Sequence, residues 1–322
     1  MIDHSTKSDT LWRHAQDHPA LPLRLRLRDS VEGLLIRVAA SGAWPPDGFL
    51  KLPDPATLAA RRGLLSIEIV SHCWQYAHLL AYQLSSIVRF PPTRAKVRMT
   101  VFHAAEDAKT RALLTFFGAL SVPNVGWNWQ VLRRERLFRR AIGRNLAARA
   151  TRADWVWFTD CDIVFHRGCL DALADRLQGS RERLVHPREE RVTAMLPPDD
   201  PLLAAADGEP RLVDIDAGRF TPLAIPVAKG AYQVVHGDIA RACGYCERPS
   251  LFQRPVPRWA KTWEDRTWRW LMRTDGTPLD VPGVHRIRHV HKGRYGALAG
   301  TRSGIRLGKY WLGDRLKKKR PG

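Results

Sequence analysis

The chain has 322 residues, of which 44% are hydrophobic and 26% are charged, a composition typical of a globular protein with a substantial core. Lysine and arginine total 52 against 32 acidic residues, a formal net charge of +20, which favours polyanions, anionic membrane surfaces or phosphorylated substrates as partners. No run approaches the roughly 18 apolar residues of a transmembrane helix, and the N-terminus lacks the basic and apolar regions of a secretory signal. We therefore expect a cytoplasmic protein.

The beginning and the end of the chain differ in composition from the rest. The first part is polar, rich in arginine and interrupted by prolines, so we expect a lead-in segment there, in which 30–39 is either a short helix or a strand. We expect the lead-in segment to cover 1–62. A main domain over 63–300 follows, with halves 63–165 and 166–300, and a basic C-terminal tail covers 301–322.

Apolar runs and amphipathic stretches alternate between residues 64 and 165. The apolar runs predict buried strands, and apolar side chains at helical spacing predict helices between them. The expected strands are 64–70, 97–102 and 155–160, with 125–131 as a further strand or a loop. The expected helices lie near 76–87, 109–120 and 133–150. This alternation is typical of an α/β fold with a doubly wound sheet, and the absence of a GxGxxG motif after the first strand disfavours dinucleotide binding.

The pattern after residue 165 is less regular. Leu170, Leu173 and Leu177 define an amphipathic helix, whereas 180–222 is charged and rich in Pro and Asp, which predicts a surface loop. The further elements that we expect are a strand over 225–235, helices over 238–243 and 259–273, and an edge strand over 286–291. Trp259, Trp263 and Trp270 share one face of their helix and are either core residues or a platform for a sugar ring.

Two acids follow the apolar strand that begins at Trp155. Because an unpaired charge is costly inside a sheet, the strand should end at Asp160, and Asp160 and Asp162 should emerge at its carboxyl end. Open α/β sheets bind ligands at this edge, and Mg²⁺ is commonly held by one or two carboxylates together with substrate phosphates. The pair is therefore a candidate metal–diphosphate anchor. The alternative is a solvated turn in which one of the acids caps a helix that starts near Gly168.

The five cysteines are sparse and odd in number, which favours a reducing compartment and buried free thiols. Cys243-Gly244-Tyr245-Cys246 matches C-x-x-C. A helix-like segment rather than a strand precedes it, and no second Cys or His pair stands at zinc-ligand spacing. We therefore expect neither a thiol-redox centre nor a zinc site.

Several short motifs follow one another between residues 64 and 295. In chain order they are the strand 65–70 with Ser71-His72-Cys73-Trp74 after it, Glu106-Asp107, Arg144-Asn145, Asp160-Cys161-Asp162, Gly230, Gly244-Tyr245-Cys246-Glu247, Glu264-Asp265, and His289 with His291. Their order and spacing are more specific than any one motif. Together they resemble the GT-A fold nucleotide-sugar glycosyltransferases, in particular glycosyltransferase family 2.

This resemblance implies a Rossmann-like, doubly wound mixed sheet in a single catalytic domain, with 63–165 as the nucleotide-binding half and 166–300 as the acceptor half. It implies an inverting, metal-dependent transfer of a sugar from a nucleotide-sugar donor, with UDP-sugars favoured, to a saccharide or lipid-linked acceptor. The cofactor would be Mn²⁺ or Mg²⁺. The resemblance implies that the donor is bound by Ser71, His72, Trp74, Asp107, Arg144, Asp160 and Gly230, and the metal by Asp160, Asp162, His289 and His291.

Transfer to a hydroxyl group needs a general base opposite the leaving group. The resemblance points to Asp265 as this base, with Glu264 as the second candidate. The residues alone leave other interpretations open. Both acids would suit pairing with neighbours such as Arg269 on a solvated helix face, and Arg144 would suit an ordinary surface position.

Two other functions stay open. Basic residues interleaved with tryptophans over 254–273 would suit a nucleic-acid binder, although no recognised binding module appears and the positive charges are spread along the chain, so we do not expect a nucleic-acid partner. A sugar-nucleotide-binding protein without catalytic activity is the other alternative.

The C-terminal tail combines aromatic and basic residues. Tyr310 and Trp311 precede the run Lys317–Arg320, a combination that suits peripheral contact with the anionic inner face of a membrane. The alternative is a solubilising end.

Overall fold

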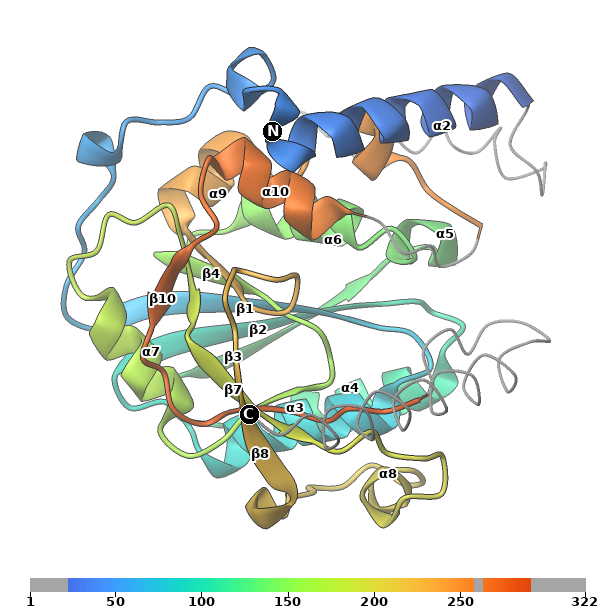
Figure 1. Cartoon of the computed structure of the whole chain (residues 1–322). Coiled ribbons are helices and arrows are strands. Elements are labelled where there is room, and N and C mark those ends of the chain that lie inside the picture. Colours follow the sequence, from blue (N-terminus) through green and yellow to red (C-terminus); the bar gives the residue numbers. More distant parts are fainter. Residues whose placement is uncertain (1–22, 258–262, 291–322) are drawn as a thin grey trace, which may run out of the picture.

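The computed structural model describes residues 23–257 and 263–290. A seven-stranded mixed sheet forms its centre (Figure 1). Its strands are β1 Leu65–Cys73, β2 Ala95–His103, β3 Val125–Val131, β4 Trp155–Phe158, β6 Leu184–Pro187, β9 Gln233–His236 and β10 Thr277–Leu279. They lie in the order β10-β6-β9-β4-β1-β2-β3. All neighbouring strands are parallel except β9, which is antiparallel to both β4 and β6.

The order of the strands creates a topological switch point beside β1. From β1 the chain proceeds to β2 and β3 on one side, and it then crosses over to β4 on the other side. Both β1 and β4 are buried almost throughout. The continuous apolar sequence of β4 predicts this, whereas β1 also buries the polar side chains of Glu68, Ser71 and His72. The carboxyl ends of β1 and β4 therefore flank the crevice in which sheets of this kind bind ligands.

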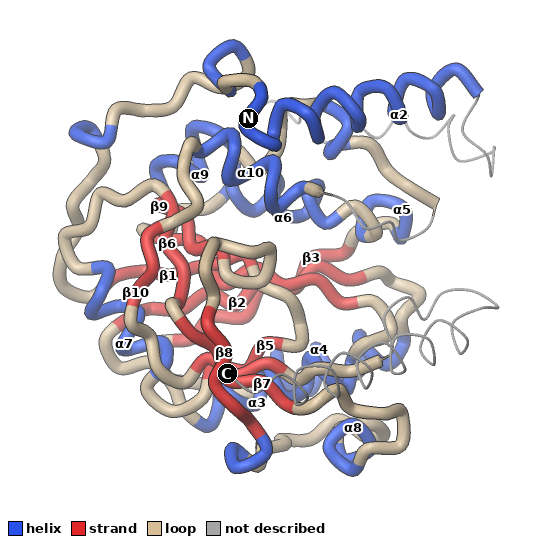
Figure 2. Tube along the Cα trace, in the orientation of Figure 1, coloured by secondary structure: helices blue, strands red, loops and turns tan. Residues whose placement is uncertain are grey.

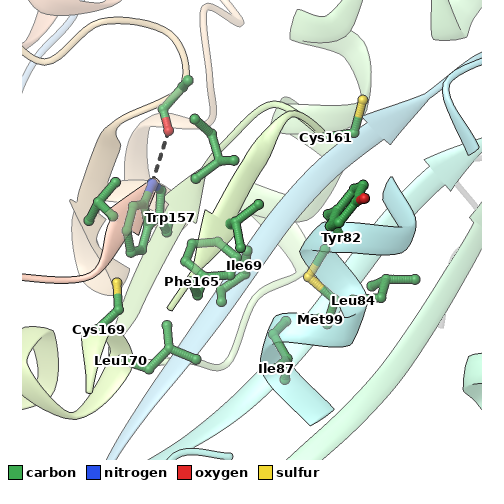
Figure 3. Close-up of a cluster of buried hydrophobic side chains, with 14 of the residues drawn as sticks. Ile69, Tyr82, Leu84, Ile87, Met99, Trp157, Cys161, Phe165, Cys169 and Leu170 are labelled. Carbon is green, nitrogen blue, oxygen red and sulfur yellow. Dashed lines mark hydrogen bonds between the residues drawn. The ribbon is translucent and has the colours of Figure 1, made fainter. Parts of the chain in front are cut away.

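Helices cover both faces of the sheet (Figure 2). One face carries α3 Ala77–Arg89, α4 Ala108–Gly118 and α7 Cys169–Leu177. The other carries α6 Arg140–Ala150, α9 Gly237–Cys243 and α10 Glu264–Met272, with the short α5 Arg134–Leu137 before α6. Figure 3 shows the core on the first face, where Trp157 packs near Phe165 and Ile69 and its indole N–H donates to the backbone oxygen of Ala231 at 3.1 Å.

A second, four-stranded sheet lies beside the first one. It consists of β5 Ile163–Phe165, β11 Val284–Arg286, β7 Glu189–Thr193 and β8 Phe220–Ala224, in the order β5-β11-β7-β8. The short α8 Pro201–Ala205 stands between β7 and β8 in the sequence. Because β5 begins directly after the turn that carries the two acids, the small sheet fixes the far side of that turn.

The N-terminal part of the described chain packs over the face of the main sheet that α6 and α10 cover. The helix α2 Leu23–Val38 continues into the π-helical turn η1 Ala39–Ala43, which contacts α10. The short 3₁₀ turns η2 Pro46–Gly48 and η3 Pro55–Thr57 follow before β1, and η5 Ser250–Gln253 packs against α2. The segment 30–39 is thus mainly helix. No helix within 23–257 and 263–290 is long and apolar enough to cross a bilayer.

The α/β class and the mixed, doubly wound sheet are confirmed, and 125–131 is a strand. Four local predictions were wrong. The helix expected over 133–150 is divided, because Arg139 has non-helical angles of φ −101° and ψ 85°. The segment 180–222 is not a loop throughout, since it contains β6, β7 and α8. Within 225–235 only Gln233–Val235 belongs to a strand. Of the described part of the edge strand expected over 286–291, only Arg286 belongs to a strand, β11 Val284–Arg286, which lies inside the small sheet.

Polarity misled these predictions because charged side chains point inward. Glu190 in β7 is 1% exposed and pairs with Arg286 of the neighbouring β11. Part of the predicted helix 259–273, including Trp259, lies outside the described residues, as do His291 and the basic tail. The membrane contact expected of the tail therefore stays a prediction.

Candidate active site

The turn between β4 and β5 carries the two acids at the predicted edge of the sheet. β4 ends at Phe158, and Asp160 and Asp162 follow before Ile163 begins β5. The side-chain amide of Gln83 donates to the backbone oxygens of Asp160 at 2.9 Å and Ile163 at 3.0 Å, which fixes the shape of the turn. The capping alternative does not hold, because the N-cap of α7 is Gly168 without a side-chain cap.

Two arginines one helical turn apart on α6 face Asp160. Arg140 forms a short ion pair with Asp160 Oδ1, and Arg144 Nη2 lies 3.4 Å from the same oxygen. The Arg144 side chain is fully buried, and it donates to the oxygen of Gly230 at 2.7 Å and to the Tyr245 hydroxyl at 2.9 Å. Arg144 is therefore not an ordinary surface arginine.

The positive charge of this pair is retained despite burial. Burial by itself would lower the pKa of Arg140, but the carboxylates of Asp160 and Glu264 raise it above its ordinary value. The pKa of Arg144 is also raised, against the effect of burial, by Tyr245, Glu264 and Asp160. Two guanidinium groups thus stay charged in a site with little solvent, where their field is strong.

Glu264 and Asp265 begin α10 and border the same cluster. Glu264 is 2% exposed, and its Oε1 lies 3.3 Å from Arg140 Nε and 4.0 Å from Arg144 Nη1. Asp265 is half-buried. It lies next to Gly230, since a Cβ built on Gly230 would be 3.5 Å from the Cβ of Asp265. The alternative of a pairing with Arg269 does not hold, since Arg269 binds Asp275 at 3.0 Å instead.

The end of β1 contributes Ser71 and His72 to the crevice floor. Both are buried, and no other described residue hydrogen-bonds the Ser71 hydroxyl or either ring nitrogen of His72. His72 stacks on Phe102 with ring centroids 5.1 Å apart. Burial, reinforced by Arg144 and Arg140, lowers the pKa of His72 well below its ordinary value, so its ring is neutral.

Trp74 and Asp107 lie at the entrance to the helices that follow β1 and β2. Trp74 packs edge-on against Phe138 at 5.6 Å. The carboxylate of Asp107 caps α4, accepting from the backbone N–H of Thr110 at 3.2 Å and its hydroxyl at 2.7 Å. It also accepts from the backbone N–H of Gln75 at 2.6 Å. Asp107 thus ties the loop after β1 to α4.

Asp162 is bonded through its backbone to the segment after β11. It is 8% exposed, and its backbone oxygen accepts from Ile287 N at 3.0 Å. Its charge helps to raise the pKa of Arg286 against the effect of burial, together with Tyr232 and Glu190. His289 is 3% exposed and meets Tyr76 edge-on at 5.3 Å. Within 23–257 and 263–290, no three His, Cys, Asp or Glu side chains converge as a metal cluster.

The structure thus brings six predicted residues together around α6. Arg144 contacts Asp160, Gly230 and Glu264, Asp265 lies beside Gly230, and His72 lies against Gly143 of the same helix. Sequence reasoning missed Arg140, although its spacing of four from Arg144 already indicates a shared helix face. It named Tyr245 only as part of a motif and gave it no role, whereas the Tyr245 hydroxyl accepts from Arg144 at 2.9 Å and donates to the Gln233 side chain at 2.8 Å. The five cysteines are buried free thiols.

The segment at the centre of this site matches a known protein family. The family model described as glycosyl transferase family 2 matches residues 107–198. That segment runs from Asp107 through both arginines of α6 to the two acids and β6. The resemblance to glycosyltransferase family 2 is confirmed. No curated protein sequence matches the chain.

Two solved structures resemble the chain at low identity. The S. aureus TarS 1-349 structure is 12% identical with a TM-score of 0.39, and the match covers 70% of this chain and 58% of that one. A mannosyltransferase, PcManGT from Pyrobaculum calidifontis, determined with GDP-Man and Mn²⁺, is 14% identical with a TM-score of 0.41, covering 90% and 76%. The chain therefore spans little more than half of the first of these.

Proposed function

We propose that residues 63–300 form a glycosyltransferase that moves a sugar from a nucleotide-sugar donor to a saccharide or lipid-linked acceptor. The observation that carries the proposal is the cluster of Arg140 and Arg144 against Asp160 and Glu264 at the switch point of the sheet. The match of residues 107–198 to the family model supports it, since that segment contains both arginines and both acids of the turn.

The leaving group of such a reaction is a nucleoside diphosphate, whose negative charge grows as the bond to the sugar breaks. Arg140 and Arg144 suit its stabilisation, because a charged, buried guanidinium donates strong hydrogen bonds to phosphate oxygens. Arg140 is the more accessible of the two, with 24% of its side chain exposed. We assign contact with the diphosphate to Arg140, and to Arg144 the task of holding Gly230, Tyr245 and Asp160 in place.

A divalent cation fits the chemistry of the turn. Asp160 and Asp162 supply carboxylate oxygens, the ligands that Mg²⁺ and Mn²⁺ prefer, and the donor phosphates would complete the coordination. Asp160 has 34% of its side chain exposed and could reach both a metal and the arginines. When bound, the cation would supply Lewis-acid stabilisation of the diphosphate. His289 is a further candidate ligand.

Asp265 is our proposed general base, removing the proton from the acceptor hydroxyl as that oxygen attacks the sugar carbon. Glu264 is less suited, because its carboxylate forms ion pairs with Arg140 and Arg144. Asp265 borders Gly230, since a Cβ built on Gly230 would lie 3.5 Å from the Cβ of Asp265 and 3.7 Å from Nη1 of Arg144. Attack on the face opposite the diphosphate would invert the configuration at the anomeric carbon.

The test is a screen of UDP-, GDP- and dTDP-sugars for donor hydrolysis and transfer, with Mn²⁺, with Mg²⁺ and with a chelator. We expect metal-dependent turnover of one donor class, with UDP-sugars favoured, and loss of both turnover and metal-dependent nucleotide binding in Asp162→Ala. Thermal stabilisation by nucleotide without turnover of any donor would indicate an inactive binding protein. Stabilisation by single-stranded DNA alone, at physiological salt, would indicate the nucleic-acid binder.

A further inference from the structure

The helix α2 carries an aliphatic stripe on the side that faces away from the protein. Val31, Leu34, Leu35 and Val38 are 58%, 62%, 64% and 52% exposed. Their spacing of three, four and seven residues places them on one helix face. In an ordinary surface helix such a stripe is buried against the core. Figure 1 shows α2 as the outermost helix on the α6–α10 side of the sheet.

The inward face of α2 carries both of its acids at 28–38. Asp29 and Glu32 both pair with Arg254, which lies 2.8 Å from Glu32 Oε2 and also forms a short ion pair with Asp29. Glu32 further accepts from the backbone N–H of Leu251 at 3.1 Å. The inward face is thus held by these ion pairs together with Ile36, which is buried in the core beside Leu251 and Phe252, and the exposed aliphatic stripe lies on the opposite face. An outward apolar stripe of this kind marks an interaction surface.

Tryptophan and arginine side chains extend this surface. Trp263 is 44% exposed and lies between the guanidinium groups of Arg37 at 5.7 Å and Arg266 at 5.8 Å. Leu34 and Trp263 line one groove of about 490 Å³ between α2 and the start of α10. Both acids of α2 are paired with Arg254, so the exposed charges among its side chains at 28–38 are Arg28 and Arg37.

We propose that this surface, formed by the outward side of α2 together with Trp263, docks on an anionic lipid bilayer. Aliphatic side chains would enter the boundary between headgroups and acyl chains, as in helices that lie in a membrane interface. Tryptophan suits that boundary because one end of its ring is apolar and the other is polar. Arg28 and Arg37 add attraction to anionic headgroups.

Charge decides between a bilayer and a second copy of this chain. Two copies would bring the same exposed arginines together, and each carries a formal net charge of +20, so their association would be opposed by repulsion. An anionic bilayer turns the same charges into attraction. The proposal does not depend on the proposed function, since binding is measured without donor or acceptor.

The test is sedimentation of the full chain with vesicles of phosphatidylcholine alone and vesicles that also contain phosphatidylglycerol. We expect binding to the second kind only, weakened by added salt. The double variant Leu34→Ser with Leu35→Ser should have a vesicle affinity at least roughly tenfold lower than that of the parent, because two aliphatic side chains no longer enter the bilayer. Both side chains are exposed, so the variant should keep the parental circular dichroism and thermal midpoint.

The matched control removes exposed aliphatic side chains elsewhere. Val131→Ser in β3 and Leu223→Ser in β8 change residues that are 62% and 40% exposed, and binding should stay parental. Parental binding by the Leu34 and Leu35 variant would overturn the proposal and assign binding to another basic surface, such as the tail. If the parental protein is a dimer and the Leu34 and Leu35 variant is a monomer, the stripe is the docking site of a second copy of the chain. If vesicle binding appears only after residues 1–22 are removed, the stripe on α2 is the docking site of that N-terminal segment and not of the bilayer.

Discussion

Glu264 and Asp265 are neighbours in the sequence, but their surroundings assign them different tasks. Glu264 is held by Arg140 at 3.3 Å, whereas Asp265 borders Gly230 and its backbone oxygen accepts from Gln233 at 3.1 Å. A carboxylate in an ion pair positions its partner. Asp265 forms no ion pair with residues of 23–257 and 263–290, so it is better placed to accept a proton. The two acids should therefore affect different kinetic constants.

We predict that Asp265→Asn lowers kcat by roughly a hundred- to ten-thousand-fold, while donor affinity stays nearly parental. Glu264→Gln should mainly weaken donor binding, because Arg140 and Arg144 lose a partner that orients them. Steady-state kinetics combined with calorimetric titration of the nucleotide separates the two effects. The reverse result, a collapse of kcat in Glu264→Gln with near-parental turnover in Asp265→Asn, would make Glu264 the base.

Arg140 offers a second test at the same scale. We predict that Arg140→Gln lowers affinity for the nucleotide by roughly tenfold to a hundredfold, because one charge-assisted contact with the diphosphate is lost. Arg149→Gln is the control on the same helix, since Arg149 pairs with the exposed Glu247 at 2.8 Å and such pairs contribute little. Isothermal titration measures both. Equal affinity in the two variants would remove Arg140 from the donor site.

The contact between α6 and β1 shows how a single small residue sets the distance between two elements. A Cβ on Gly143 would lie 2.2 Å from His72 Nε2 and 3.0 Å from Phe102. Both rings are buried and stacked on each other, so neither can move away without opening the core. The close approach brings Arg140 and Arg144 to the carboxyl end of β4.

We predict that Gly143→Ala lowers the free energy of unfolding by about 1–3 kcal/mol, the usual cost of overpacking. Gly33→Ala in α2 is the matched helical control, because its new Cβ would meet Leu251 at an ordinary 3.6 Å. That control should be stabilised by up to about 1 kcal/mol through helix propensity. Urea denaturation measures both. A stable Gly143→Ala variant would show that α6 can shift without loss of packing.

At the scale of elements, the sequence predicted the parts whose signal is local. The strands up to Phe158 and the helices between them follow from apolar runs and helical spacing, except for the break at Arg139, and they place Arg144 and Asp160 at one edge. Strands β6 and β7 were missed because their pattern depends on distant partners. Glu190 can be buried because distant residues pair with its carboxylate, namely Arg286, 96 residues later, at 2.8 Å and the hydroxyl of Tyr232. The role of Arg140 was missed for the same reason, since its partner Glu264 comes from α10.

Six histidines in the folded molecule share one electrostatic property. Burial lowers the pKa of each below its ordinary value of 6.5, and in His72 the charges of Arg144 and Arg140 lower it further. The six are His72, His103, His166, His186, His236 and His285. The unfolded chain therefore takes up protons before the folded one does as the pH falls.

We predict that these histidines make their whole contribution to the free energy of unfolding above about pH 6.5. That free energy should decrease as the pH falls through this value towards the lowered pKa values of the folded state. The slope should be about 1.4 kcal/mol per pH unit for each proton that unfolding takes up. Urea denaturation between about pH 7.5 and about pH 5.5 measures it, and His186→Asn should show a shallower decrease. A stability independent of pH in this window would contradict the assignment of neutral buried histidines.

The antiparallel strand β9 determines how the whole molecule can move. Its four residues are paired with all four of β4, from Trp155 with His236 to Phe158 with Gln233. The segment that carries Asp160 and the segment that carries Gly230 are thus joined by a continuous ladder of backbone hydrogen bonds. Rotating one part of the sheet away from the other would break this ladder, so hinge bending between them is mechanically blocked. Access to the crevice must then be controlled by side chains and loops at its rim, and changes in substrate preference should arise there as well.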